Sequence, residues 1–79
     1  MMRTLRLAFC GCGNNARAHA RTLREVPEVT FRAYWNRAED WQLAESMRQE
    51  FGGDYCARDF TRIAEDPEVD AVYITTMHN

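Results

Sequence analysis

Several features that would place a chain in a membrane, on nucleic acid or outside the cell are missing from this sequence. No apolar run approaches the ~20 residues that a membrane-spanning helix needs, and the opening MMRTLRLAF lacks the longer apolar core and the cleavage site of a signal peptide. Acidic residues outnumber basic ones by twelve to ten, which gives a net charge of −2. The chain therefore offers no basic field for nucleic acid and no polybasic patch for a membrane surface. Its 79 residues, 46% hydrophobic and 28% charged, are typical of one small soluble globular domain.

Cysteine is scarce and unevenly placed. The three residues, Cys10, Cys12 and Cys56, do not form the two closely spaced pairs of a structural zinc site. Together with His19 they could form a zinc site, but a second tight pair of ligands is missing. We expect Cys10 and Cys56 to be buried as small hydrophobic residues and Cys12 to lie in a turn. Reduced thiols and the lack of an export signal predict a cytoplasmic protein, and no metal site is expected.

The most informative segment is LRLAFCGCGNNARAHARTL, residues 5–23. A strand-like run leads directly into a glycine-containing turn and then a helix, which is the order that builds a dinucleotide-binding site. Gly11 permits the sharp turn, Gly13 lets the backbone approach a pyrophosphate, and Ala16 replaces a third glycine where helix and strand pack closely. Free N–H groups at the helix start then face the anion, helped by the helix dipole. The candidate cofactor-binding residues of this turn are Gly11, Cys12, Gly13, Asn14, Asn15 and Ala16.

Strands and helices are predicted to alternate along the whole chain, without a linker or a repeat. Their short connections imply a parallel sheet with right-handed crossovers, the doubly wound α/β fold of Rossmann type. The strand order of this fold is 3-2-1-4-5-6, and the chain supplies the first four strands. The fourth strand would then form an open apolar edge, which folded proteins avoid, so we expect residues 1–79 to belong to a longer protein. A glycine turn alone also occurs in ordinary strand-to-helix connections, and the alternation favours the nucleotide-binding interpretation. The predicted strands are residues 5–10, 29–35, 55–56 and 71–75, and the predicted helices are residues 15–25, residues 39–51 and a brief one capped by Asp59.

Each predicted helix has one apolar side that we expect to face the sheet. The brief third helix is expected to turn Phe60, Ile63 and Ala64 inward. The apolar residues of the first two helices are Ala16, Ala20 and Leu23, then Leu43, Ala44, Met47 and Phe51.

Two stretches carry a family resemblance that covers nearly the whole chain. GCGNNARAHARTL resembles the GCGxxARxHxxAL run of the glucose-fructose oxidoreductase, inositol dehydrogenase and related (Gfo/Idh/MocA) family. DPEVDAVYITT, residues 66–76, is similar to that family's fourth-strand segment, DPEVDAVxIATP. The resemblance implies an N-terminal domain that binds NAD or NADP, followed by a larger α+β domain that holds a small-molecule substrate and often builds homo-oligomers. The implied reaction is hydride transfer at a hydroxyl or carbonyl carbon of a sugar, cyclitol or similar molecule.

Two other functions stay open. The family's catalytic lysine and histidine lie beyond Asn79, so the catalytic residues are unknown, and a non-catalytic dinucleotide-binding or sensor protein on the same fold is an alternative. A flavodoxin-like binding domain is a weaker alternative, because it needs no glycine turn of this spacing.

The end of the second strand bears on the choice between NAD and NADP. NAD-selective folds of this type usually place Asp or Glu there, where the carboxylate binds ribose hydroxyls and repels a 2′-phosphate. Here Asn36 is neutral, and Arg37 offers a guanidinium suited to phosphate, so the pair favours NADP. Asn36 is also suited to cap the following helix, with Glu39 completing a capping box, and one residue can do both.

Three polar residues remain as candidates at other positions. Thr75 and Thr76 follow the fourth strand at the carboxyl edge of the sheet, and each is either a cofactor contact or simply a strand end. On the first helix, we expect His19 to make a structural hydrogen bond rather than to act in catalysis.

Overall fold

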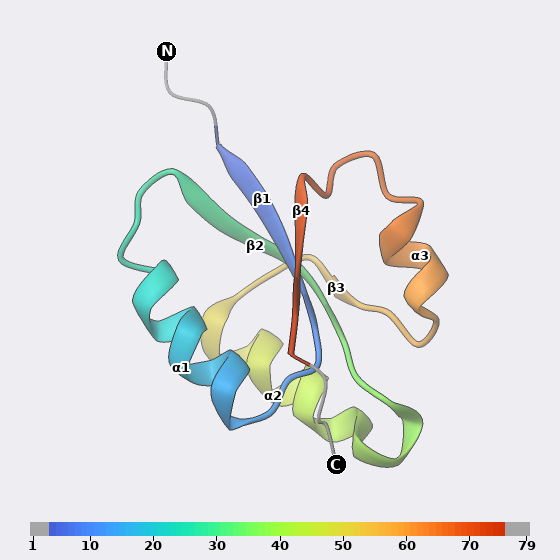
Figure 1. The fold of residues 1–79 in the computed structure, drawn as a ribbon. Coiled ribbons are helices and arrows are strands. Elements are labelled where there is room, and N and C mark those ends of the chain that lie inside the picture. The colour runs from blue at the N-terminus through green and yellow to red at the C-terminus, as the bar shows by residue number, and fades with distance from the viewer. Residues whose placement is uncertain (1–3, 76–79) are drawn as a thin grey trace.

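A parallel sheet of four strands forms the centre of the structure, a computed structural model that describes residues 4–75 (Figure 1). The strand order is β3-β2-β1-β4, which confirms the order predicted from the sequence. Helices α1 and α2 cover one face of the sheet and α3 covers the other (Figure 1). Within residues 4–75, no helix has the length and apolar character to cross a bilayer. The elements are β1 (Leu5–Cys10), α1 (Asn14–Leu23), β2 (Val29–Trp35), the 3-10 turn η1 (Ala38–Asp40), α2 (Trp41–Phe51), β3 (Tyr55–Cys56), α3 (Phe60–Ala64) and β4 (Ala71–Ile74).

The bounds of the helices and strands differ from the prediction at four places. α1 begins at Asn14 rather than at residue 15. α1 ends at Leu23 rather than at residue 25, because the N–H of Val26 turns back to the carbonyl oxygen of Leu23 at 3.0 Å, just ahead of Pro27. The helix predicted over residues 39–51 is a 3-10 turn followed by α2. β4 ends at Ile74, one residue earlier than predicted.

The larger hydrophobic core lies between the sheet and the pair α1 and α2. Phe9 of β1 and Tyr34 of β2 are wholly buried and stack with their ring centroids 5.8 Å apart. From α1, Ala16 and Ala20 are also wholly buried, and their small side chains let this helix approach the sheet closely. The remaining buried residues of this core are Leu7, Cys12, Ala44 and Met47.

The face under α3 has a smaller core, in which one prediction is wrong. Of the three residues expected to face inward, only Ile63 is buried, while Phe60 is 39% exposed and Ala64 is exposed. Because α3 has only five residues, it presents little more than one turn to the sheet. Phe60 instead lies edge-on to Trp35, with the ring centroids 6.0 Å apart. The core under α3 consists of Ala8, Cys10, Ala33, Ala57 and Ile63.

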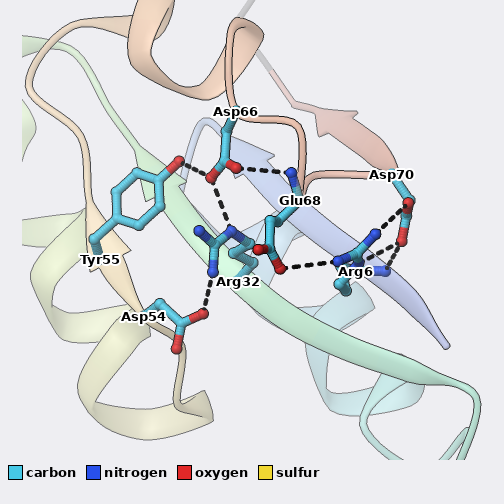
Figure 2. A network of polar contacts seen from close by, with 7 residues as sticks. All are labelled: Arg6, Arg32, Asp54, Tyr55, Asp66, Glu68 and Asp70. Atoms are coloured by element: carbon cyan, nitrogen blue, oxygen red, sulfur yellow. Dashed lines mark hydrogen bonds and ion pairs between the residues drawn. The ribbon is translucent and has the colours of Figure 1, made fainter.

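A network of charged residues joins the segment before β4 to β1 and β2 (Figure 2). Arg6 of β1 donates from Nε to Asp70 at 2.9 Å and from Nη1 to Glu68 at 2.9 Å. Arg32 of β2, the extra residue where the register of β1 and β2 shifts, donates from Nε to Asp66 at 2.8 Å. The acidic residues of the DPEVD segment therefore hold β4 in place beside β1.

Asp66 is the most buried carboxylate of this network. Its side chain is 8% exposed, and it accepts hydrogen bonds from the Tyr55 hydroxyl at 2.6 Å and from the Glu68 N–H at 2.8 Å, besides that from Arg32. The hydrogen bonds from Tyr55 and Arg32 lower the pKa of Asp66 to about 2. Burial, followed by the bond to this carboxylate, raises the pKa of Tyr55 to about 12. Asp66 is therefore ionised in the folded protein at neutral pH.

Candidate functional site

A cleft of about 1050 Å³ opens where β1, β2 and β4 end, beside the first turn of α1. Its volume is that of a small-molecule site, and its position at the carboxyl ends of parallel strands is where open α/β sheets bind ligands. Thr76, the tenth residue that the sequence singled out, lies outside the described residues. The other nine all line this cleft: Gly11, Cys12, Gly13, Asn14, Asn15, Ala16, Asn36, Arg37 and Thr75.

Gly11 is required by the backbone of the turn. Its φ is +98°, and a Cβ at this position would lie 2.4 Å from the carbonyl oxygen of Thr75. The Thr75 hydroxyl donates to the Gly11 carbonyl oxygen at 2.9 Å, and the Thr75 N–H donates to Cys10 at 2.9 Å. Thr75 is thus more than a strand end, because its side chain holds the turn against β4.

Gly13 differs from Gly11, because nothing in the described part of the chain requires glycine at this position. Its φ of −83° and ψ of −163° are extended values that any residue adopts. A Cβ added to Gly13 would meet no atom of residues 4–75 within 4 Å, its two chain neighbours aside. The absence of a side chain therefore leaves open the surface of the cleft that a pyrophosphate needs in order to approach the backbone.

The start of α1 presents N–H groups without a side-chain cap. Gly13 is the N-cap residue and offers no side chain, and the first turn contains no acidic residue. The first N–H that bonds within the helix is that of Arg17, which donates to Gly13 at 3.1 Å. The preceding N–H groups belong to Asn14 and Asn15, which are exposed, and to Ala16, which is buried against the sheet. This helix start is suited to bind an anion.

Cys12 turns its side chain into the core rather than toward the cleft. The side chain is wholly buried, and its Sγ lies 3.5 Å from the carbonyl oxygen of Trp35. Burial raises the pKa of the Cys12 thiol to about 12, so it is protonated at neutral pH. Cys10 is buried as expected, whereas Cys56 is only partly buried. In residues 4–75, no three His, Cys, Asp or Glu side chains are placed to hold a metal ion together.

Asn36 bridges the glycine turn and the loop that follows β2. Its Oδ1 accepts a hydrogen bond from the Cys12 N–H at 2.9 Å, and its Nδ2 donates to the Asp40 carbonyl oxygen at 2.9 Å. The expected capping box is therefore wrong: the N-cap residues of η1 and α2 are Arg37 and Asp40, and neither makes a side-chain cap bond. Sequence spacing missed the true partner because Cys12 is 24 positions away from Asn36.

Arg37 extends into solvent at the edge of the cleft. Its side chain is 66% exposed, and its Nε lies 4.0 Å from a carboxylate oxygen of Glu39, which is 71% exposed. An ion pair this long and this exposed contributes little. The guanidinium of Arg37 is therefore able to leave Glu39 for a stronger anion.

Six further residues line the cleft that the sequence did not single out as binding residues. His19 was expected to make a structural hydrogen bond, but its ring instead lies 4.9 Å from that of Tyr73, centroid to centroid. Arg17 donates to Ser46 at 2.6 Å and forms an ion pair with Glu50, so it ties α1 to α2. Trp35 is the last residue of β2 and Tyr73 the last but one of β4, so their places in the strands could have predicted that both lie near this edge of the sheet. The six residues are Arg17, His19, Trp35, Asp40, Leu43 and Tyr73.

Several solved structures share this fold. KijD10, a 3-ketoreductase from Actinomadura kijaniata in complex with NADP and TDP-benzene, is 25% identical with a TM-score of 0.77, over 90% of this chain and 21% of its own. A myo-inositol dehydrogenase from Lactobacillus casei, in complex with NAD(H) and myo-inositol, is 25% identical with a TM-score of 0.79, over 92% of this chain and 22% of its own. GenD2 from gentamicin A biosynthesis, in complex with NAD, is 23% identical with a TM-score of 0.83, over 96% of this chain and 21% of its own.

The chain thus spans about a fifth of the length of these structures. No curated protein sequence matches it. The sequence pattern of the Gfo/Idh/MocA family, described as an oxidoreductase family with an NAD-binding Rossmann fold, matches residues 5–79. The chain therefore belongs to the Gfo/Idh/MocA family of oxidoreductases.

Proposed function

We propose that residues 1–79 form the adenosine- and pyrophosphate-binding part of an NADP-preferring oxidoreductase. The observation that carries the proposal is Gly13, which has an ordinary backbone conformation and an open Cβ position at the head of an uncapped helix. Glycine at this position has no packing role among residues 4–75. A pyrophosphate held by the neighbouring N–H groups, in contrast, requires that no side chain intervenes. The cofactor, when bound, supplies hydride chemistry.

The pyrophosphate-binding groups in this proposal are the N–H groups at the start of α1. Asn14 and Asn15 are exposed and line the cleft. The N–H of Cys12 is already bonded to Asn36, so the anion is left to the groups that follow it. Thr75, which lines the cleft beside Gly11, is a further candidate for a contact to the cofactor.

The preference for NADP rests on the residues after β2. The position that usually carries a ribose-binding carboxylate is Asn36, which does not repel a 2′-phosphate. Arg37 is exposed, and among residues 4–75 its one ion pair is the long contact to Glu39, so its guanidinium is able to bind that phosphate with charge-assisted hydrogen bonds. Asp40 and Glu39 are acidic residues of the same loop and oppose this preference.

The substrate in this proposal is a sugar, cyclitol or similar small molecule with a hydroxyl or carbonyl carbon. Two structures that are similar to this chain support it, since one was solved with myo-inositol and the other is a 3-ketoreductase solved with TDP-benzene. In this proposal the described residues bind the cofactor. We assign none of them a role in acting on the substrate.

The proposal is tested by calorimetric titration of the full-length protein with NADP and with NAD. We expect both to bind, with NADP tighter by about tenfold, the worth of one charge-assisted contact to phosphate. Arg37→Ala should remove most of this difference, whereas Arg21→Ala, a control on an exposed arginine of α1 outside the cleft lining, should leave it unchanged. Absence of binding by both cofactors at millimolar concentration contradicts the proposal. Binding without turnover of any polyol or sugar would favour the non-catalytic sensor.

A further inference from the structure

Asn36 connects two parts of the cleft that come from distant segments of the chain. On one side its Oδ1 accepts from the Cys12 N–H in the glycine turn, and on the other its Nδ2 donates to the Asp40 carbonyl oxygen at the end of η1. Both bonds are 2.9 Å long, and Asn36 is partly buried. The loop that Asn36 holds in this way spans the exposed Arg37.

The two hydrogen bonds of Asn36 require a side-chain amide whose oxygen faces Cys12 and whose nitrogen faces Asp40. The group facing Cys12 has to accept a hydrogen bond and the group facing Asp40 has to donate one, and Asn is the residue of this size with both functions. A carboxylate at position 36 would place an oxygen against the Asp40 carbonyl oxygen, where neither donates. The Asp or Glu typical of NAD-selective folds therefore does not fit this loop as it stands.

We propose that Asn36 is a positioning residue for cofactor selectivity, whose side-chain amide holds the loop after β2 against the glycine turn and so directs Arg37 to the 2′-phosphate of NADP. This inference rests on the proposed function and adds to it the means by which Arg37 is held. Besides lacking the charge that would repel a 2′-phosphate, a property that alanine at position 36 would share, Asn36 acts on selectivity through Arg37. The two residues should consequently depend on each other in their effect on selectivity.

A double-mutant cycle on the full-length protein separates positioning from direct contact. Asn36→Ala should lower the ratio of NADP to NAD affinity about fivefold when Arg37 is present. In the Arg37→Ala background, the same change should alter this ratio by less than about twofold, since the guanidinium that it positions is gone. Equal effects in the two backgrounds would show that Asn36 acts on the ribose or phosphate by itself, and would overturn the inference.

A second readout follows the turn itself. Hydrogen exchange of the Cys12 N–H should be faster in Asn36→Ala than in the wild type, because its acceptor is lost. Gln42→Ala, which removes an exposed amide from the start of α2 outside the cleft lining, should leave both the exchange rate and the affinity ratio unchanged. If Asn36→Ala does not fold, Asn36→Ser is measured in the same cycle with the same expectation.

The outcomes distinguish this inference from the proposed function. If the wild type binds neither cofactor, the proposed function fails and the inference fails with it. If the wild type prefers NADP but Asn36→Ala lowers only the melting temperature and leaves the affinity ratio unchanged, the proposed function stands and the inference is wrong.

Discussion

The same substitution should affect different properties at the two glycines of the turn: alanine at Gly11 should lower stability, and alanine at Gly13 should lower cofactor affinity. In Gly11→Ala the new Cβ lies 2.4 Å from the Thr75 carbonyl oxygen, on a residue with φ of +98°. The left-handed backbone costs ~1–2 kcal/mol for alanine, and the overlap adds ~1–3 kcal/mol. We therefore expect the free energy of unfolding to fall by about 2–5 kcal/mol.

Gly13→Ala should leave the fold nearly intact and weaken cofactor binding. The backbone of Gly13 is in an allowed region, and a new Cβ would meet no atom of the described residues within 4 Å, its chain neighbours aside. Alanine is a poorer N-cap than glycine but loses less entropy on folding, so we expect a change in unfolding free energy within ~1 kcal/mol. Affinity for NADP and for NAD should fall about 10- to 100-fold, because the methyl group lies where the pyrophosphate approaches the helix start.

Denaturant melts and calorimetric titration of both variants measure these two effects. Gly52→Ala is the control for strain: Gly52 has φ of +81° at the end of α2, away from the cleft, and its substitution should lower stability without changing affinity. If Gly13→Ala binds both cofactors as tightly as the wild type, the pyrophosphate does not approach this turn and the reasoning is refuted.

Three further predictions concern single residues. Glu39→Gln should raise NADP affinity about threefold and leave NAD affinity unchanged, because the long ion pair of Glu39 with Arg37 no longer competes with the 2′-phosphate; equal gains for both cofactors in a titration would be inconsistent with this. The pKa of Asp66 is lowered to about 2, below the unfolded value of ~3.9, so the stability that its ionised form contributes is present above pH ~4 and is lost as the pH falls toward 2. Urea melts at pH 6 and pH 3 should therefore show a smaller loss for Asp66→Asn than for the wild type, and an equal loss would count against this role. Iodoacetamide at pH 7.5 should leave Cys12 of the native protein unmodified and label it after unfolding, since its thiol is buried with a pKa of about 12; mass spectrometry that finds Cys12 labelled in the native state would contradict its placement in the core.

The sequence predicts the sheet well because the signals for it are local. Alternating strand and helix patterns with short connections determine the order β3-β2-β1-β4, and the glycine turn predicts which residues gather at the carboxyl edge. The predicted positions of Gly11 and of Ala16 follow from conformation and size, which are properties of the residue itself.

Features that depend on distant partners were not predictable in this way. Asn36 matches a helix cap by spacing, but its amide bonds the N–H of Cys12 from another element. The side chains of Phe60 and Ala64 have helical spacing, but α3 is too short to bury more than Ile63. The spacing of residues along the sequence predicts which side chains share a face of a helix. It does not predict which distant residues that face contacts in the fold.

The central claim is that the uncapped N–H groups at the start of α1 bind the pyrophosphate of the cofactor. Its most direct test is an amide chemical-shift titration of the isotopically labelled full-length protein with NADP. We predict that the amides of residues 13–16 shift together, at the concentration that saturates binding, and that adenosine without phosphate leaves them in place. Saturable binding of NADP that leaves these four amides unmoved would contradict the account.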